Sequence, residues 1–311
     1  MALGLAALTT LAACTEELPN TAPPEPRPQS RGVLPTTAPP APSAESEALA
    51  LYYRRLQNDL LAQGLLRGDG GGQDTAFTDT MLARNFVRIA LFDEYVTDGD
   101  FLRPQATLSR LRRWDQPVRM MVEFGPSVPS DQRIRDRASV SSYAARLARV
   151  TGQSIRLSDS APNFHVLILN EDDRRAYGNR LREIVPGIST GSLNAILNLP
   201  RDQLCIVVAF SEGGTASYSK AVAVIRGEHP PLLRTSCIHE ELAQGLGLAN
   251  DSPQARPSIF NDDEEFGLLT NHDELLLQML YDPRLRTGMA PAEAAPIARQ
   301  IAREIMASGP S

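Results

Sequence analysis

Histidine and cysteine are scarce in this chain of 311 residues, which has four histidines and three cysteines. The histidines are His165, His229, His239 and His272. No two of them are four residues apart, so no helix can carry the pair of histidines that holds zinc on one face. A conventional three-histidine zinc site is therefore not expected.

Long basic runs and long apolar runs are also missing. The net charge is −6, and without a basic patch we expect no nucleic-acid partner. The longest apolar stretch, residues 2–13, is too short to span a bilayer as a helix. The overall composition, 42% hydrophobic and 22% charged, is that of an ordinary globular protein.

The N-terminal segment has the pattern of a bacterial lipoprotein signal. Small residues lead to Leu11-Ala12-Ala13-Cys14, which predicts a signal peptide over 1–13 and a lipid on Cys14. No Lys or Arg precedes the apolar run, a departure consistent with a start codon further upstream. Thr15, in place of Asp, favours the outer membrane. We expect a periplasm-facing, lipid-anchored envelope protein.

The lipidated Cys14 and a proline-rich tether fill residues 14–43. Nine prolines lie between Pro19 and Pro42, and such a segment buries too little apolar surface to fold. The globular domain is expected over 44–311. In an oxidising compartment the two remaining cysteines, Cys205 and Cys237, predict a disulfide. The alternative is two buried thiols, because sequence alone does not show that they are close.

Hydrophobic periodicity predicts two N-terminal helices followed by alternating strands and helices. The helices are expected at 45–66, 78–95 and 140–150, and the strands at 118–124, 164–169, 204–210 and 218–225. The glycine-rich stretch Gly68–Gly72 lacks the Lys-Ser/Thr of a phosphate loop and is expected to be a hinge or surface loop. The fold class is α+β, one domain with a mixed sheet and an N-terminal helical extension.

The segment Glu240–Asp251, EELAQGLGLAND, has the frame of the zinc-protease pattern H-E-x-x-H-x-x-G-x-x-H. Glu241 takes the general-base position, and Gly247 takes the glycine position, where a left-handed residue turns the chain. The three ligand positions hold Glu240, Gln244 and Asn250. These oxygen donors suit a hard divalent cation better than zinc. The alternative is a hydrogen-bond network that fixes the turn.

Two further groups of residues are candidates for chemistry. Asp251 and the acidic run 261–265 are candidate calcium ligands, although a solvated acidic surface explains them as well. Ser189 lies in a G-x-S-x-G match, but the segment before it is charged and helical, so a helix cap is expected instead of a nucleophile. Trp114 is expected to be a half-buried anchor.

The motif segment and the residues after it resemble the matrixin-type metzincins. Ser258-Ile259-Phe260 sits where those proteins carry the turn beneath the metal, and 269–281 resembles their closing helix. Segments 83–95, 111–125, 237–251 and 256–289 more closely resemble a proteobacterial family of lipoproteins catalogued as domain of unknown function 2927. The resemblance implies an envelope lipoprotein with a zincin-like core and no established activity.

These observations predict a non-catalytic binding or structural role for a zincin-like domain whose zinc ligands are replaced. A protein or peptide ligand and a divalent cation are the candidate partners besides the membrane. The alternative is an atypical metallopeptidase-like hydrolase that uses Glu241 as general base.

Overall fold

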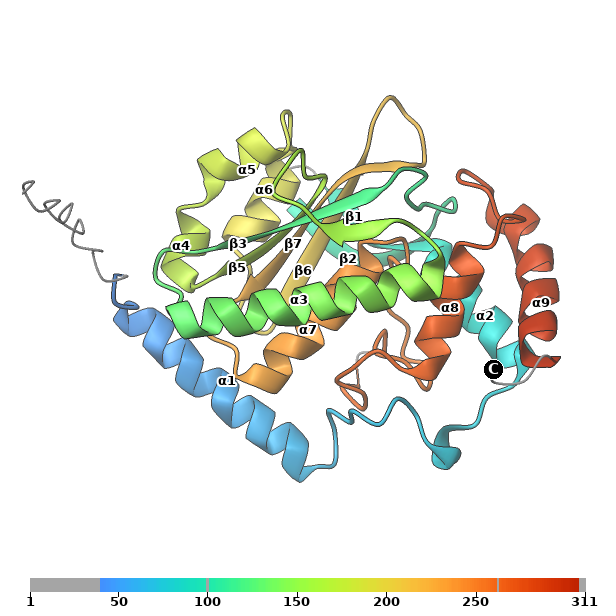
Figure 1. Ribbon diagram of the computed structural model, residues 1–311, viewed down its shortest axis with the longest axis horizontal. Coiled ribbons are helices and arrows are strands. Elements are labelled where there is room, and N and C mark those ends of the chain that lie inside the picture. The colour runs from blue at the N-terminus through green and yellow to red at the C-terminus, as the bar shows by residue number, and fades with distance from the viewer. Residues whose placement is uncertain (1–39, 99–100, 262, 308–311) are drawn as a thin grey trace, which may run out of the picture. The chain divides into compact units, whose positions relative to one another are not determined.

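The computed structural model describes residues 40–98, 101–261 and 263–307 (Figure 1). The predicted signal peptide, Cys14 and nearly all of the tether therefore lie outside the described residues. Within the described part, no helix combines the length and the apolar character needed to cross a membrane.

A five-stranded mixed sheet forms the centre of the domain (Figure 1). Its strands, in spatial order, are β4 (Ile155–Leu157), β3 (Val118–Phe124), β5 (Phe164–Leu169), β7 (Tyr218–Arg226) and β6 (Cys205–Ser211). The first four are parallel, and β6 runs antiparallel to β7 at the edge. The predicted strands agree to within a residue, although β4 was not predicted. The mixed α+β class is confirmed.

Helices cover both faces of this sheet (Figure 1). Every residue of β5 is buried, as expected for a strand with packing on both sides. One face packs against α3 (Ser130–Thr151) and α7 (Pro231–Gln244), and α8 (Asn271–Leu280) packs against α3. The other face packs against α5 (Gly178–Ile184) and α6 (Thr190–Leu197), with α4 (Glu171–Arg175) beside them.

The N-terminal extension differs from its prediction. The first helix, α1 (Ala44–Ala62), has the expected position, and a short 3-10 turn, η1 (Gln73–Thr75), follows the glycine-rich loop. Helix α2 (Asp79–Ala90) ends five residues before the expected Tyr95. The chain instead enters the hairpin of β1 (Phe92–Asp98) and β2 (Phe101–Leu108). Pairing with a strand that lies later in the chain overrides the local helical pattern.

Helix α3 also differs from its prediction, and the motif helix α7 begins with a proline. Helix α7 begins at Pro231, because proline is well tolerated at the first helical position. Helix α3 is longer than the predicted 140–150. Helix α9 (Pro291–Ala307) was not predicted and packs against α2.

A buried aspartate joins α8 to the turn at 258–260. One carboxylate oxygen of Asp273 accepts from the Ser258 hydroxyl at 2.6 Å, and the other accepts from the Ile259 amide at 3.0 Å. The second oxygen also accepts from the amide and hydroxyl of Thr270, which completes a capping box at the start of α8. Asp273 is 0% exposed, so this network fixes the turn relative to the helix.

Candidate functional site

The end of the motif helix has the predicted turn. Helix α7 ends at Gln244, and Gly247 has a φ of 127°, a region that favours glycine. A Cβ at this position would lie 2.2 Å from the backbone oxygen of Arg112. Trp114, in the same segment as Arg112, is 1% exposed and donates its indole N–H to the Gly245 carbonyl at 2.8 Å. Trp114 is thus a fully buried anchor for the end of α7, more enclosed than expected.

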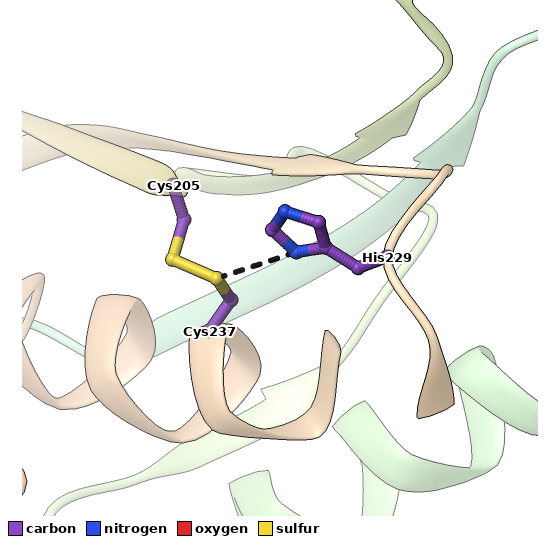
Figure 2. Close-up of a disulfide and its surroundings, with 3 residues drawn as sticks. All are labelled: Cys205, His229 and Cys237. Carbon is purple, nitrogen blue, oxygen red and sulfur yellow. Dashed lines mark hydrogen bonds between the residues drawn. A yellow bond between two sulfur atoms is a disulfide. The ribbon is translucent and has the colours of Figure 1, made fainter. Parts of the chain in front are cut away.

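The predicted disulfide is present. Cys205, the first residue of β6, is joined to Cys237 in α7 (Figure 2). The bond ties the edge strand of the sheet to the motif helix one turn before Glu240 and Glu241. The Nδ1 atom of His229 lies 3.7 Å from the Cys237 sulfur (Figure 2).

An acidic cavity of about 150 Å³ lies where the disulfide, α7 and the β1–β2 hairpin meet. Six carboxylate residues line it, together with the uncharged side chains of Tyr95, Gln203 and Gln244 and the residues around Cys205. The carboxylates, which we call the acidic cluster, are Glu94, Asp202, Glu240, Glu241, Asp251 and Glu264. Among the described residues that line the cavity, none is Lys, Arg or His.

Burial and mutual repulsion change the protonation of this cluster. Desolvation, with the charges of Asp251, Glu241, Glu264 and Glu94, raises the pKa of Glu240 well above its usual value. Desolvation and the charges of Glu94 and Asp251 likewise raise the pKa of Glu241. The cavity therefore favours any species that brings positive charge, either protons or a cation.

Glu241 is the residue of the cluster whose buried carboxylate oxygen lacks a hydrogen-bond partner among the described residues. The residue is 4% exposed, and no residue that the structure describes forms a hydrogen bond with its buried Oε2. A buried oxygen without a partner is costly unless a proton or a ligand satisfies it. One carboxylate oxygen of Glu241, one of Glu240 and the Cys205 sulfur all lie within 4.8 Å of one another. Two oxygens bound to one calcium ion are at most about 5 Å apart, so both glutamates can reach a single ion.

The structure brings together two of the three proposed ligand positions. Glu240 and Gln244 line the cavity, and the Gln244 amide donates to Asp251 at 2.9 Å. Asn250 does not line it: its amide donates to the backbone carbonyls of Arg88 and Asp251. Of the three proposed ligand positions, Glu240 and Gln244 therefore line the cavity and Asn250 does not. Asp251, the next residue, occupies the cavity in place of Asn250.

The acidic run after the motif is divided between roles. Glu264 lines the cavity with Asp251, whereas Glu265 forms ion pairs with Arg67 and Arg256. Asp263 accepts from the Glu265 amide. Asp262 lies outside the described residues.

Glu94, Tyr95, Asp202 and Gln203 are cavity residues that sequence reasoning missed. Glu94 and Tyr95 were expected in a helix, but they lie on β1, with the Tyr95 hydroxyl accepting from Gln203 at 2.7 Å. Desolvation and the neighbouring charges of Glu94, Glu241 and Asp251 raise the pKa of Tyr95. The available signal was the pair of an acidic and an aromatic residue before a β-branched stretch, which also suits a strand.

The four histidines occupy separate environments. His239 stacks on Tyr143, with ring centroids 4.0 Å apart, and its burial lowers its pKa to about 3. His165 pairs with Glu123 at 2.8 Å, and His272 contacts Asn85. Ser189 accepts from the Ser192 amide as the cap of α6, after helix α5, so the helix-cap interpretation is confirmed.

A comparison with protein families shows where the chain belongs. The model of a family described as "Protein of unknown function (DUF2927)" matches residues 79–300, a range that includes the sheet, the motif helix and the whole acidic cluster. The chain belongs to the DUF2927 family. No curated protein and no solved structure matches the chain.

Proposed function

We propose that this DUF2927 protein is a cell-envelope lipoprotein whose zincin-like domain binds a hard divalent cation in the acidic cavity. The observation that carries the proposal is Glu241: a buried carboxylate oxygen without a partner among the described residues, in a cavity lined by five more carboxylates and by no described basic residue. The oxygen donors suit calcium or manganese, and the usual zinc histidines are replaced. The role is binding, not hydrolysis.

The order of elements supports the zincin-like part of the proposal. Strands precede the motif helix, Gly247 turns the chain after it, and the turn at 258–260 and helix α8 come next. The resemblance to matrixins implies this order. Residues 1–14 support a lipid anchor, with the domain at the periplasmic face of the outer membrane, and Cys14→Ser should release the protein from membranes.

A calcium titration of the full, oxidised chain tests the cation site. Binding at one site should raise the unfolding temperature, because a ligand at a hundred times its Kd stabilises the folded state by about 2.7 kcal/mol. For a domain of this size that corresponds to roughly 5–10 °C. Manganese is the second probe, since it also accepts carboxylate ligands.

Glu241→Gln and Glu47→Gln form a matched pair for this titration. Glu241→Gln should weaken calcium binding at least about tenfold, equivalent to about 1.4 kcal/mol, because it removes a charged ligand. Glu47 is exposed on α1, so Glu47→Gln should leave the affinity unchanged. Equal calcium affinity in the two variants, or no binding by the wild type, would contradict the proposal.

The alternative function is an atypical metallopeptidase in which Glu241 activates a cation-bound water. The position of Glu241 beside Glu240 in the cavity favours it. Its raised pKa opposes it unless a cation is bound, because a protonated carboxyl cannot accept a proton. Calcium- or manganese-dependent cleavage of an unfolded protein substrate, lost in Glu241→Gln, would establish the peptidase.

A further inference from the structure

The disulfide places a sulfur atom beside the two central carboxylates of the acidic cavity. The Cys205 sulfur lies within 4.8 Å of one oxygen each of Glu240 and Glu241. Cys205 also lines the cavity, whereas Cys237 is 1% exposed within α7. While the disulfide is intact this sulfur is not a thiolate, and the thiolate is the form that ligates metal.

We propose that reduction of the Cys205–Cys237 disulfide converts the acidic cavity into a zinc site with the Cys205 thiolate, Glu240 and Glu241 as ligands. The proposal rests on the same cavity as the proposed cation-binding function and extends it to the reduced protein. The oxidised cavity offers oxygen donors, which suit hard cations. The reduced cavity adds a thiolate, which shifts the preference towards zinc.

The geometry supports this ligand set. Zinc binds sulfur at about 2.3 Å and carboxylate oxygen at about 2.0–2.2 Å, so its tetrahedral ligands lie about 3.5 Å apart. The three atoms are within 4.8 Å before any adjustment, and breaking the S–S bond frees the Cys205 side chain to rotate. The cavity of about 150 Å³ gives the sulfur space to move. Three protein ligands leave a fourth position for water.

The chemical steps balance with a phosphine as reductant. The phosphine gives two electrons to the disulfide, and water supplies the oxygen of the phosphine oxide and the two protons of the thiols. Zinc then displaces the proton of the Cys205 thiol as the Zn–S bond forms, and any protons on the Glu240 and Glu241 carboxyl groups leave to solvent as the Zn–O bonds form. The buried Oε2 of Glu241, which has no partner among the described residues, is already available as a ligand atom.

A second ligand set exists on the other side of the disulfide. The His229 Nδ1 atom lies 3.7 Å from the Cys237 sulfur (Figure 2). Burial and the charges of Arg226 and Arg234 lower the pKa of His229, which keeps its ring neutral. Among the described residues, Cys205 belongs to a group of three possible ligand atoms with Glu240 and Glu241, whereas Cys237 and His229 belong to no such group. We therefore assign the site to Cys205, and the pair of Cys237 and His229 becomes an outcome of the test.

Single-cysteine variants separate the two ligand sets without any reductant. In the full chain, Cys237→Ala leaves the Cys205 thiol beside the glutamates, and Cys205→Ala leaves the Cys237 thiol beside His229. Zinc is titrated against a chromophoric chelator, and cobalt(II) reports thiolate ligation through its charge-transfer absorption. Cys237→Ala should bind one zinc ion, and adding Glu241→Gln to it should weaken binding at least about tenfold. Cys205→Ala should bind at least about tenfold more weakly than Cys237→Ala.

Several outcomes would overturn the assignment. Zinc binding by Cys205→Ala that equals that of Cys237→Ala, or exceeds it, would place the site at Cys237 and His229. Folded Cys237→Ala without cobalt–thiolate absorption would remove the zinc site altogether. Circular dichroism verifies folding, and Cys237→Val together with phosphine-reduced wild type provides the same thiol if Cys237→Ala does not fold.

The zinc and calcium experiments can refute the two proposals separately. Calcium binding by the oxidised wild type without zinc binding by Cys237→Ala would support the proposed function and refute the reduced zinc site. Zinc binding by Cys237→Ala without calcium binding by the wild type would do the reverse.

Discussion

Removing the disulfide should destabilise the domain by an amount set by the loop that it closes. The bond closes a loop with a sequence separation of 32 between the edge strand β6 and the motif helix α7. Chain-entropy arguments assign such a loop about 3.7 kcal/mol of stabilisation at 25 °C, because the cross-link restricts the unfolded chain. For a domain of this size, the unfolding temperature should fall by roughly 7–15 °C.

The double variant Cys205→Ala/Cys237→Ala tests this magnitude without leaving a free thiol. Thermal and urea unfolding of the wild type and the variant would be followed by circular dichroism in the presence of a chelator, which excludes metal effects. A phosphine should lower the wild-type unfolding temperature and leave the variant unchanged. A difference below about 1 kcal/mol between wild type and variant would refute the reasoning, since it would mean that β6 and α7 are held together without the cross-link.

Two further predictions concern groups outside the cavity. Burial raises the pKa of Glu123, but hydrogen bonds with His165 and Arg180 lower it by more. The pKa of Glu123 therefore falls from 4.5 to about 2. A carboxyl group whose pKa is lowered by folding stabilises the folded state at any pH above its pKa in the unfolded chain, and this stabilisation is lost as the pH falls towards 2. In urea unfolding, Glu123→Gln should therefore cost about 3 kcal/mol at pH 7 and much less near pH 2. Asp273→Ala should cost about 3–5 kcal/mol, because it leaves the buried amides of Ile259 and Thr270 without an acceptor, whereas exposed Asp159→Ala should change stability by less than about 0.5 kcal/mol. If Glu123→Gln lowered the free energy of unfolding equally at both pH values, the role assigned to Glu123 would be wrong. If Asp273→Ala and Asp159→Ala lowered it equally, the role assigned to Asp273 would be wrong.

The parts of the fold that depend on local spacing could be predicted from the sequence. Strands β3 and β5 are short apolar runs between clear boundaries, and their limits match. Gly247 was expected to turn the chain because only glycine readily adopts its conformation, and its φ is positive. The disulfide was expected because two cysteines remain after Cys14 and the expected compartment is oxidising. Each of these inferences needs only nearby residues or a count.

The cavity could be predicted only in part, because its walls come from distant segments. Glu240 and Gln244 were expected on one face of α7, since a helix brings residues four apart together. Glu94 reaches the same cavity from the β1–β2 hairpin, so its position depends on the pairing of these two strands. The hydrophobic periodicity of the sequence, which predicted a helix through this segment, does not reveal that pairing.

Asn250 and Asp251 show how far a motif frame can determine a site. The frame places a ligand three residues after Gly247, yet the backbone there is held by the bond from the Asn250 amide to Ile89 and by the side-chain bond to Arg88. These bonds direct Asn250 towards α2 and leave Asp251 to face Gln244. Because the Asp251 carboxylate lies in the cavity where the motif frame places the Asn250 amide, the cavity is more acidic than the frame implied. That change favours a hard cation over zinc in the oxidised protein, and it is why a thiolate from Cys205 would be needed to bring zinc back.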